Sequence, residues 1–174
     1  ILEINIVKPR NKTIEYGVYL GLALILSYAE SLIPFSFGLP GLKLGLTNLI
    51  VVIMLYNNDT YGAISVSLIR IILSGILFGN PFSILYSLGG GLLSFLVMLL
   101  LKKTKQFQLI TVSIAGGFFH NLGQILIACI VVGNTGLFFY FPILGFGGMV
   151  TGFFIGYIAL ELLHRLPFRT GDYL

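Results

Sequence analysis

Long stretches of apolar side chains run through most of this sequence, and they restrict the possible folds more than any other feature. Of the 174 residues, 57% are hydrophobic and only 9% are charged, and the mean hydropathy is +1.01. Soluble domains carry about 25% charged residues, and a soluble chain of this length could not bury so much apolar surface. The composition therefore predicts an all-α integral membrane protein whose apolar faces are solvated by lipid.

About 20 helical residues are needed to cross roughly 30 Å of bilayer hydrocarbon. The apolar runs, separated by polar, proline or glycine breaks, predict six transmembrane helices in a single domain over residues 1–174. The second span is short and is preceded by Pro34 and Pro40, so residues 33–44 are expected to form an ordered loop or a partly re-entrant piece. The spans are expected at about 14–33, 42–57, 60–78, 82–101, 108–133 and 138–164.

Lysine and arginine are distributed unevenly among the ends of these spans. With the N-terminus in the cytoplasm, Lys43 lies near the outer side and Arg70 lies within a span, whereas the other eight basic residues fall on the inner side. Both termini are then cytoplasmic, which requires an even number of spans. Because the basic residues lie at helix ends rather than on one face, they favour a topology signal over nucleic-acid binding. The inner residues are Lys8, Arg10, Lys12, Lys102, Lys103, Lys105, Arg165 and Arg169.

Several polar or ionisable residues lie inside the predicted spans or at their outer ends. Such side chains cost several kcal/mol in a membrane unless they are paired or face a polar cavity. They are therefore the candidate substrate-binding residues of this chain. The set comprises Glu30, Lys43, Asn48, Arg70, His120, Asn121 and Gln124.

Arg70 lies near the middle of the third predicted span. Its guanidinium stays protonated, so it needs an acid, a series of carbonyls or a ligand anion as partner. One interpretation is an ion pair of Glu30 with Arg70 or with Lys43. The other is a bound anionic group, because one acid against two bases leaves the outer half of the bundle short of negative charge.

The fifth predicted span carries His120, Asn121 and Gln124. His120 and Gln124 share a helix face at the i, i+4 spacing. The three residues are interpreted either as a polar stripe that lines a cavity or as side chains that join helices, with a proton or electron relay as a third option. Metal-ligand spacing is absent, since Cys129 is more than two turns away and His164 lies at the opposite membrane face, so neither a metal nor a cofactor is expected.

Catalytic and nucleotide-binding signatures are also missing from the sequence. It contains no glycine-rich phosphate loop, no nucleophile elbow and no clustered carboxylates for metal-assisted diphosphate chemistry. The chain is therefore not expected to be an enzyme, and any ATP hydrolysis is assigned to partner subunits.

Five short motifs follow one another in a specific order, and together they resemble the Gx transporter family, which is often labelled heptaprenyl diphosphate synthase component I. The resemblance covers roughly residues 12–165. The motifs are Ser27-Tyr28-x-Glu30, Pro40-Gly41-x-Lys43-Leu44-Gly45-Leu46-x-Asn48, Ser67-Leu68-x-Arg70, Leu77-Phe78-Gly79 and His120-Asn121-Leu122-Gly123-Gln124.

This resemblance implies a six-helix fold like the substrate-binding S components of energy-coupling factor (ECF) transporters, in the cell membrane of a prokaryote. A small ligand is expected to bind from outside, beneath the loop at 34–41. The excess of basic over acidic residues in the outer half of the bundle favours an anionic ligand. The implied partners are a transmembrane scaffold protein and two ATPase subunits. Small residues of the first helix, Gly17, Gly21 and Ala23, are the candidates for docking to the scaffold.

Two other functions remain open at this point. Proteins similar to this one accompany flavin-based extracellular electron transfer, so the chain is also interpreted as a membrane component of a quinone- or flavin-linked assembly. The third interpretation is an accessory protein of prenyl diphosphate or quinone biosynthesis.

Overall fold

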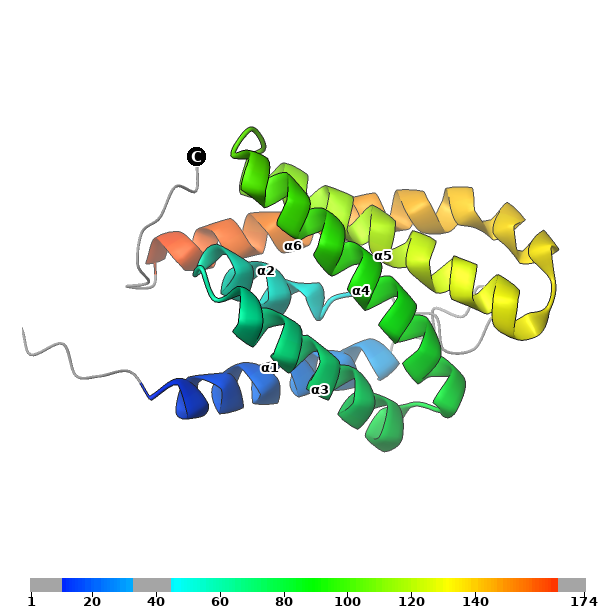
Figure 1. The fold of residues 1–174 in the computed structure, drawn as a ribbon, viewed down its shortest axis with the longest axis horizontal. Helices are drawn as coiled ribbons and strands as arrows, with labels where there is room; N and C mark the ends of the chain where they lie inside the picture. Colours follow the sequence, from blue (N-terminus) through cyan, green and yellow to red (C-terminus); the bar gives the residue numbers. More distant parts are fainter. Residues whose placement is uncertain (1–10, 33–44, 166–174) are drawn as a thin grey trace, which may run out of the picture.

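The computed structural model describes residues 11–32 and 45–165, and the elements in these ranges are helices joined by short turns. Figure 1 shows them as an elongated bundle. The helices are α1 (Lys12–Leu32), α2 (Asn48–Tyr56), α3 (Thr60–Phe78), α4 (Pro81–Thr104), α5 (Leu109–Val132), the short 3₁₀-helix η1 (Thr135–Tyr140) and α6 (Phe141–Arg165).

Four helical stretches in the described part of the chain are long and apolar enough to cross a membrane: α3, α4, α5 and the continuous stretch Thr135–Arg165. The prediction of an all-α, multi-pass membrane protein is confirmed at this level. The third predicted span coincides with α3, because Asp59 caps the helix by accepting a hydrogen bond from the backbone of Gly62 at 3.0 Å.

The second predicted span, 42–57, differs most from the helix that forms. Helix α2 begins only at Asn48, because Gly45 takes a left-handed conformation with φ of 85°, which a continuous right-handed helix excludes. At about 1.5 Å per residue, a helix of this length covers roughly 14 Å, less than half of the hydrocarbon thickness. Residues 42–44 lie outside the described ranges.

Helix α2 occupies the centre of the bundle. All of its residues except Leu49 are buried, and it packs against α1, α3, α4, α5 and α6. Figure 1 shows α2 between α1 and α6. A helix that is apolar on most sides suits such a surrounded position, where protein side chains cover it.

Glycine allows α5 and α6 to approach with their backbones in contact. A Cβ atom on Gly117 would collide with the carbonyl oxygen of Gly148, and one on Gly152 would lie 2.6 Å from the carbonyl oxygen of Ser113. The Ser113 hydroxyl donates a hydrogen bond of 2.8 Å to the Gly152 carbonyl. Small residues and interhelical hydrogen bonds are the main source of helix association in lipid.

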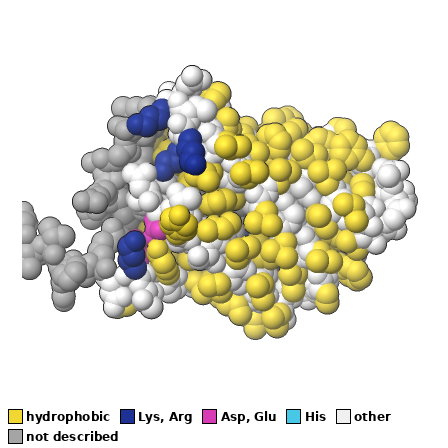
Figure 2. Space-filling model, in the orientation of Figure 1, with side chains coloured by type: hydrophobic (Ala, Val, Ile, Leu, Met, Phe, Trp, Pro, Cys, Tyr) yellow, Lys and Arg dark blue, Asp and Glu magenta, His cyan; other side chains and the backbone are white. Residues whose placement is uncertain are grey.

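Basic side chains gather at one end of the molecule, and hydrophobic side chains cover most of the remaining face in Figure 2. The described basic residues at helix ends belong to the start of α1 and to the ends of α4 and α6, namely Lys12, Lys102, Lys103, Lys105 and Arg165. Their location at one end is in keeping with the predicted inner side. Lys8, Arg10, Lys43 and Arg169 lie outside the described ranges.

Candidate functional site

The carboxylate of Glu30, near the end of α1, is buried and binds the backbone at the start of α2. Its Oε1 atom accepts hydrogen bonds from the backbone N–H groups of Gly45, at 2.5 Å, and Leu46, at 3.4 Å. A carboxylate at the N-terminal end of a helix receives unsatisfied N–H donors and complements the helix dipole. Glu30 thereby fixes the end of α1 to the beginning of α2.

Gly45 is the point at which α2 meets α5. A Cβ atom at this position would lie 3.1 Å from Cδ2 of His120 and 3.2 Å from Nδ2 of Asn48. The Gly45 carbonyl accepts a hydrogen bond from the backbone N–H of Asn48 at 2.9 Å. The turn therefore brings Glu30, Asn48 and His120, from three different helices, around one glycine.

His120 and Gln124 form a pair on the face of α5 that is directed to α4 and to Gly45. Nε2 of Gln124 lies 2.8 Å from Nε2 of His120, and both side chains are buried. Because the amide nitrogen can only donate, the imidazole Nε2 is the acceptor and the ring proton lies on Nδ1. Gly90 of α4 packs closely here, since its Cβ would lie 2.6 Å from the His120 carbonyl oxygen.

Arg70 is buried in the middle of α3, with 2% of its surface exposed. Among the described residues, Arg70 and Glu30 form no ion pair with each other, in contrast to Glu161 and Arg165 at 2.6 Å. The Nη2 atom of Arg70 is buried and has no hydrogen-bond partner.

Asn121 and Ala23 are separated from this group of residues. The Asn121 amide donates to the carbonyl of Leu144 at 2.6 Å and therefore joins α5 to α6. Ala23 is 2% exposed and packs in the core, whereas Gly17 and Gly21 on the same helix have open space where a side chain would be. Lys43, the remaining candidate, lies outside the described ranges.

We refer to Glu30, Asn48, Arg70, His120 and Gln124 as the polar cluster. Sequence reasoning did not include the buried hydroxyl groups that accompany it, although spacing could have identified several of them. Ser67 and Ser74 lie three residues before and four after Arg70, on its side of α3, and Ser27 lies one turn before Glu30. The buried serine and threonine residues on α1, α3 and α4 and in the turn before α2 are Ser27, Thr47, Ser67, Ser74, Ser83, Ser87 and Ser94.

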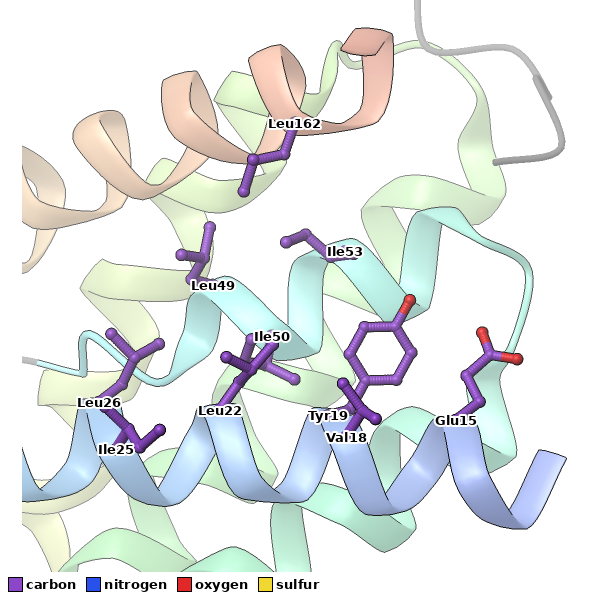
Figure 3. Close-up of a pocket in the computed structure, with 10 residues that line it drawn as sticks. All are labelled: Glu15, Val18, Tyr19, Leu22, Ile25, Leu26, Leu49, Ile50, Ile53 and Leu162. Atoms are coloured by element: carbon purple, nitrogen blue, oxygen red, sulfur yellow. The ribbon is translucent and has the colours of Figure 1, made fainter. Parts of the chain in front are cut away.

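A separate apolar groove of about 550 Å³ lies between α1, α2 and α6. Figure 3 shows Glu15 and Tyr19 towards one end of the groove and Ile25 and Leu26 at the other. Helices α1 and α6 flank it without packing against each other in the described residues. The groove is lined by Glu15, Val18, Tyr19, Leu22, Ile25, Leu26, Leu49, Ile50, Ile53 and Leu162.

The fold and the site together define a class: a multi-pass helical membrane protein with a polar cluster buried in its interior. The model of the family described as heptaprenyl diphosphate synthase component I matches residues 19–162. The chain therefore belongs to this family, as its motifs predict. No match was found among curated proteins or among solved structures.

Proposed function

We propose that this protein is the substrate-binding membrane subunit of an ECF-type importer, which captures a small molecule from the outer side of a prokaryotic cell membrane. The observation that carries the proposal is the polar cluster. It combines side chains from α1, α2, α3 and α5, and these residues are nearly inaccessible to solvent. Buried polar groups at membrane depth are costly and are typical of substrate pathways and binding sites.

The proposed topology has six membrane-crossing segments with both termini in the cytoplasm. The 21 residues of α1 reach about 31 Å at 1.5 Å per residue, which is enough to cross the hydrocarbon. Helix α2 would belong to the second crossing. The basic end of the bundle would be cytoplasmic by the positive-inside rule.

The scaffold protein and two ATPase subunits are proposed as partners, and the chain itself would catalyse no reaction. Gly17 and Gly21 support a docking face on α1, because nothing lies within 4 Å of a Cβ atom at either position. A partner helix could approach the α1 backbone closely there. ATP hydrolysis by the partners would then drive release of the ligand inside.

Native mass spectrometry of the detergent-purified protein tests this proposal. We expect a retained small molecule, and co-purification of a scaffold and ATPases when all subunits are co-expressed in the native host. Absence of both a retained molecule and the partner subunits would exclude the importer function.

The apolar groove supports a second candidate function, which is the binding of a prenyl or quinone chain. The protein would then be a component of a quinone- or flavin-linked electron-transfer assembly, or an accessory protein of prenyl diphosphate or quinone biosynthesis. The groove has an aliphatic lining and opens between α1 and α6, a shape that suits an extended hydrocarbon chain. Organic extraction of the purified protein, followed by analysis for quinones and prenyl compounds, tests it. A stoichiometric quinone or prenyl compound that is lost in Leu22→Trp would favour this function over import.

A further inference from the structure

We infer that the ligand of the polar cluster presents an anionic oxygen group, a carboxylate or a phosphate, to the guanidinium of Arg70. This inference rests on the proposed binding function and specifies its substrate class. It follows from the donors and acceptors that the cluster leaves unmatched.

Arg70 provides the first part of the argument. It is 2% exposed, its Nη2 atom has no hydrogen-bond partner, and no hydrogen bond of its guanidinium to another described residue is found. A permanently charged guanidinium at this depth is strongly destabilising without an acceptor. Among the described residues, no side chain or backbone carbonyl accepts a hydrogen bond from the Arg70 guanidinium.

Glu30 would be the obvious acceptor, but its carboxylate has another role. Its Oε1 atom binds the backbone N–H groups of Gly45 and Leu46. Glu30 and Arg70, both described, form no ion pair with each other. A guanidinium stays protonated in proteins, and the planar set of donors on Arg70 is therefore available to a bound anion.

Asn48 adds a second donor of the same kind. Its Nδ2 atom is buried and has no hydrogen-bond partner, and it lies beside Gly45. The hydroxyl of Ser27, one turn before Glu30, is likewise buried without a partner. A hydroxyl can donate or accept, whereas an amide NH₂ and a guanidinium can only donate. The buried donors without a partner, Nη2 of Arg70 and Nδ2 of Asn48, therefore call for acceptor oxygens, and a ligand with a planar or tetrahedral anionic group provides several.

The test uses the purified full chain and a water-soluble metabolite extract of the expression host. Anion exchange at neutral pH divides the extract into an anionic pool and a flow-through pool of neutral and cationic molecules. Thermal unfolding is followed with a thiol-reactive fluorophore, because Cys129 is the only cysteine in the sequence. We expect the anionic pool alone to raise the unfolding midpoint of the wild type, and native mass spectrometry to identify the bound molecule.

Two substitutions at Arg70 and one matched control complete the design. Arg70→Gln should weaken binding of the identified molecule at least about tenfold. Arg70→Lys should weaken it less, because the positive charge remains while the planar, bidentate donor geometry of the guanidinium is lost. Lys103→Gln removes an exposed positive charge on α4 and should bind like the wild type. If Arg70→Gln fails to fold, the comparison of pools with the wild type and the affinity of Arg70→Lys still decide the question.

Phosphatase treatment of the anionic pool tests for a phosphate monoester, because a lost effect indicates this group. A retained effect leaves a carboxylate to be identified by mass spectrometry, and both outcomes agree with the inference. Stabilisation by the flow-through pool alone, or equal binding by Arg70→Gln and wild type, would overturn the inference and leave the importer function in place. If neither pool stabilises the wild type, the inference fails. If, in addition, no molecule and no partner subunits co-purify, the proposed function fails with it.

Discussion

The carboxylate of Glu30 and the backbone N–H of Gly45 are joined by a 2.5 Å hydrogen bond across 15 residues of sequence. This bond ties the C-terminal end of α1 to the turn that starts α2. The same turn contacts His120 on α5, so one glycine connects three helices. The stability of the bundle and the geometry of the polar cluster are consequently linked at this position.

Replacement of Glu30 should therefore destabilise the fold. A hydrogen bond to a charged group contributes about 1.5–3 kcal/mol, so Glu30→Ala is expected to lower the free energy of unfolding by about 2 kcal/mol or more. Glu30→Gln retains an acceptor oxygen and should cost about half as much. Chemical unfolding in detergent, followed through Cys129, measures both.

Glu161→Gln is the matched control for this pair of variants. Glu161 forms a surface ion pair with Arg165, and the Glu161 side chain is 46% exposed. Such i, i+4 pairs contribute only about 0.3–0.5 kcal/mol, so the control should unfold almost like the wild type. Equal losses in Glu30→Ala and Glu161→Gln would show that the bond to Gly45 has no special importance.

Gly45→Ala should disturb the polar cluster beyond the cost of its backbone conformation. Gly45 has φ of 85°, and a Cβ atom there would also crowd His120 and Asn48 at 3.1 and 3.2 Å. Gly133→Ala is a suitable control, because Gly133 has φ of 69° but nothing within 4 Å of its Cβ position. Both substitutions should lose about 1 kcal/mol from backbone strain, and only Gly45→Ala should also lose binding of the retained molecule.

Much of the fold follows from the sequence, and α3 shows why. A long apolar run is bounded by Asp59, which caps the helix, and by Gly79, so that both its identity and its ends are defined locally. The start of α2 is not defined in this way. The apolar pattern continues through residues 44–47, but Gly45 takes a positive φ where it meets Glu30 of α1 and His120 of α5, and the helix begins only at Asn48.

The site was predicted less completely than the fold, for two physical reasons. The sequence indicates Glu30 as a candidate partner for a basic side chain, and charge counting does not reveal that its Oε1 atom also binds backbone N–H groups. The sequence places Asn121 beside His120, but adjacent helical residues point about 100° apart. Because α5 is apolar on most sides and carries glycine towards both α4 and α6, no amphipathic pattern separates these two faces.

The close contact of α5 and α6 predicts severe effects of alanine at Gly117 or Gly148. A Cβ atom at Gly148 would lie 2.7 Å from the Asn121 amide and closer still to the Gly117 backbone, which cannot rotate away. We expect a loss of at least about 2 kcal/mol for each substitution. Gly147→Ala, at an open position next to Gly148, should be neutral or slightly stabilising because alanine favours helix. Parallel melting curves of the three variants decide the matter.

The pairing of His120 with Gln124 predicts a defined tautomer. The amide of Gln124 donates to Nε2, so neutral His120 should carry its proton on Nδ1. The chain contains only two histidines, so ¹⁵N spectra of histidine-labelled protein can be assigned with one substitution. Gln124→Leu should shift the His120 signals towards the Nε2–H form and leave those of exposed His164 unchanged. A wild-type spectrum dominated by the Nε2–H tautomer would contradict the pairing.

The open glycines of α1 predict a variant that separates ligand binding from coupling. Gly17→Leu and Gly21→Leu add bulk where no atom of the protein lies within 4 Å, so the fold and binding of the retained molecule should be preserved. If a scaffold helix docks on this face, either leucine should abolish co-purification of the scaffold and ATPases, because small residues are needed for close helix approach. Gly147→Leu places the same bulk at an open position on α6 and should leave the assembly intact.

Ala23→Leu is unsuitable for this comparison, since Ala23 is buried and a larger side chain there would destabilise the core whatever the partner. Unchanged co-purification with both leucine variants on α1 would place the docking surface elsewhere on the bundle.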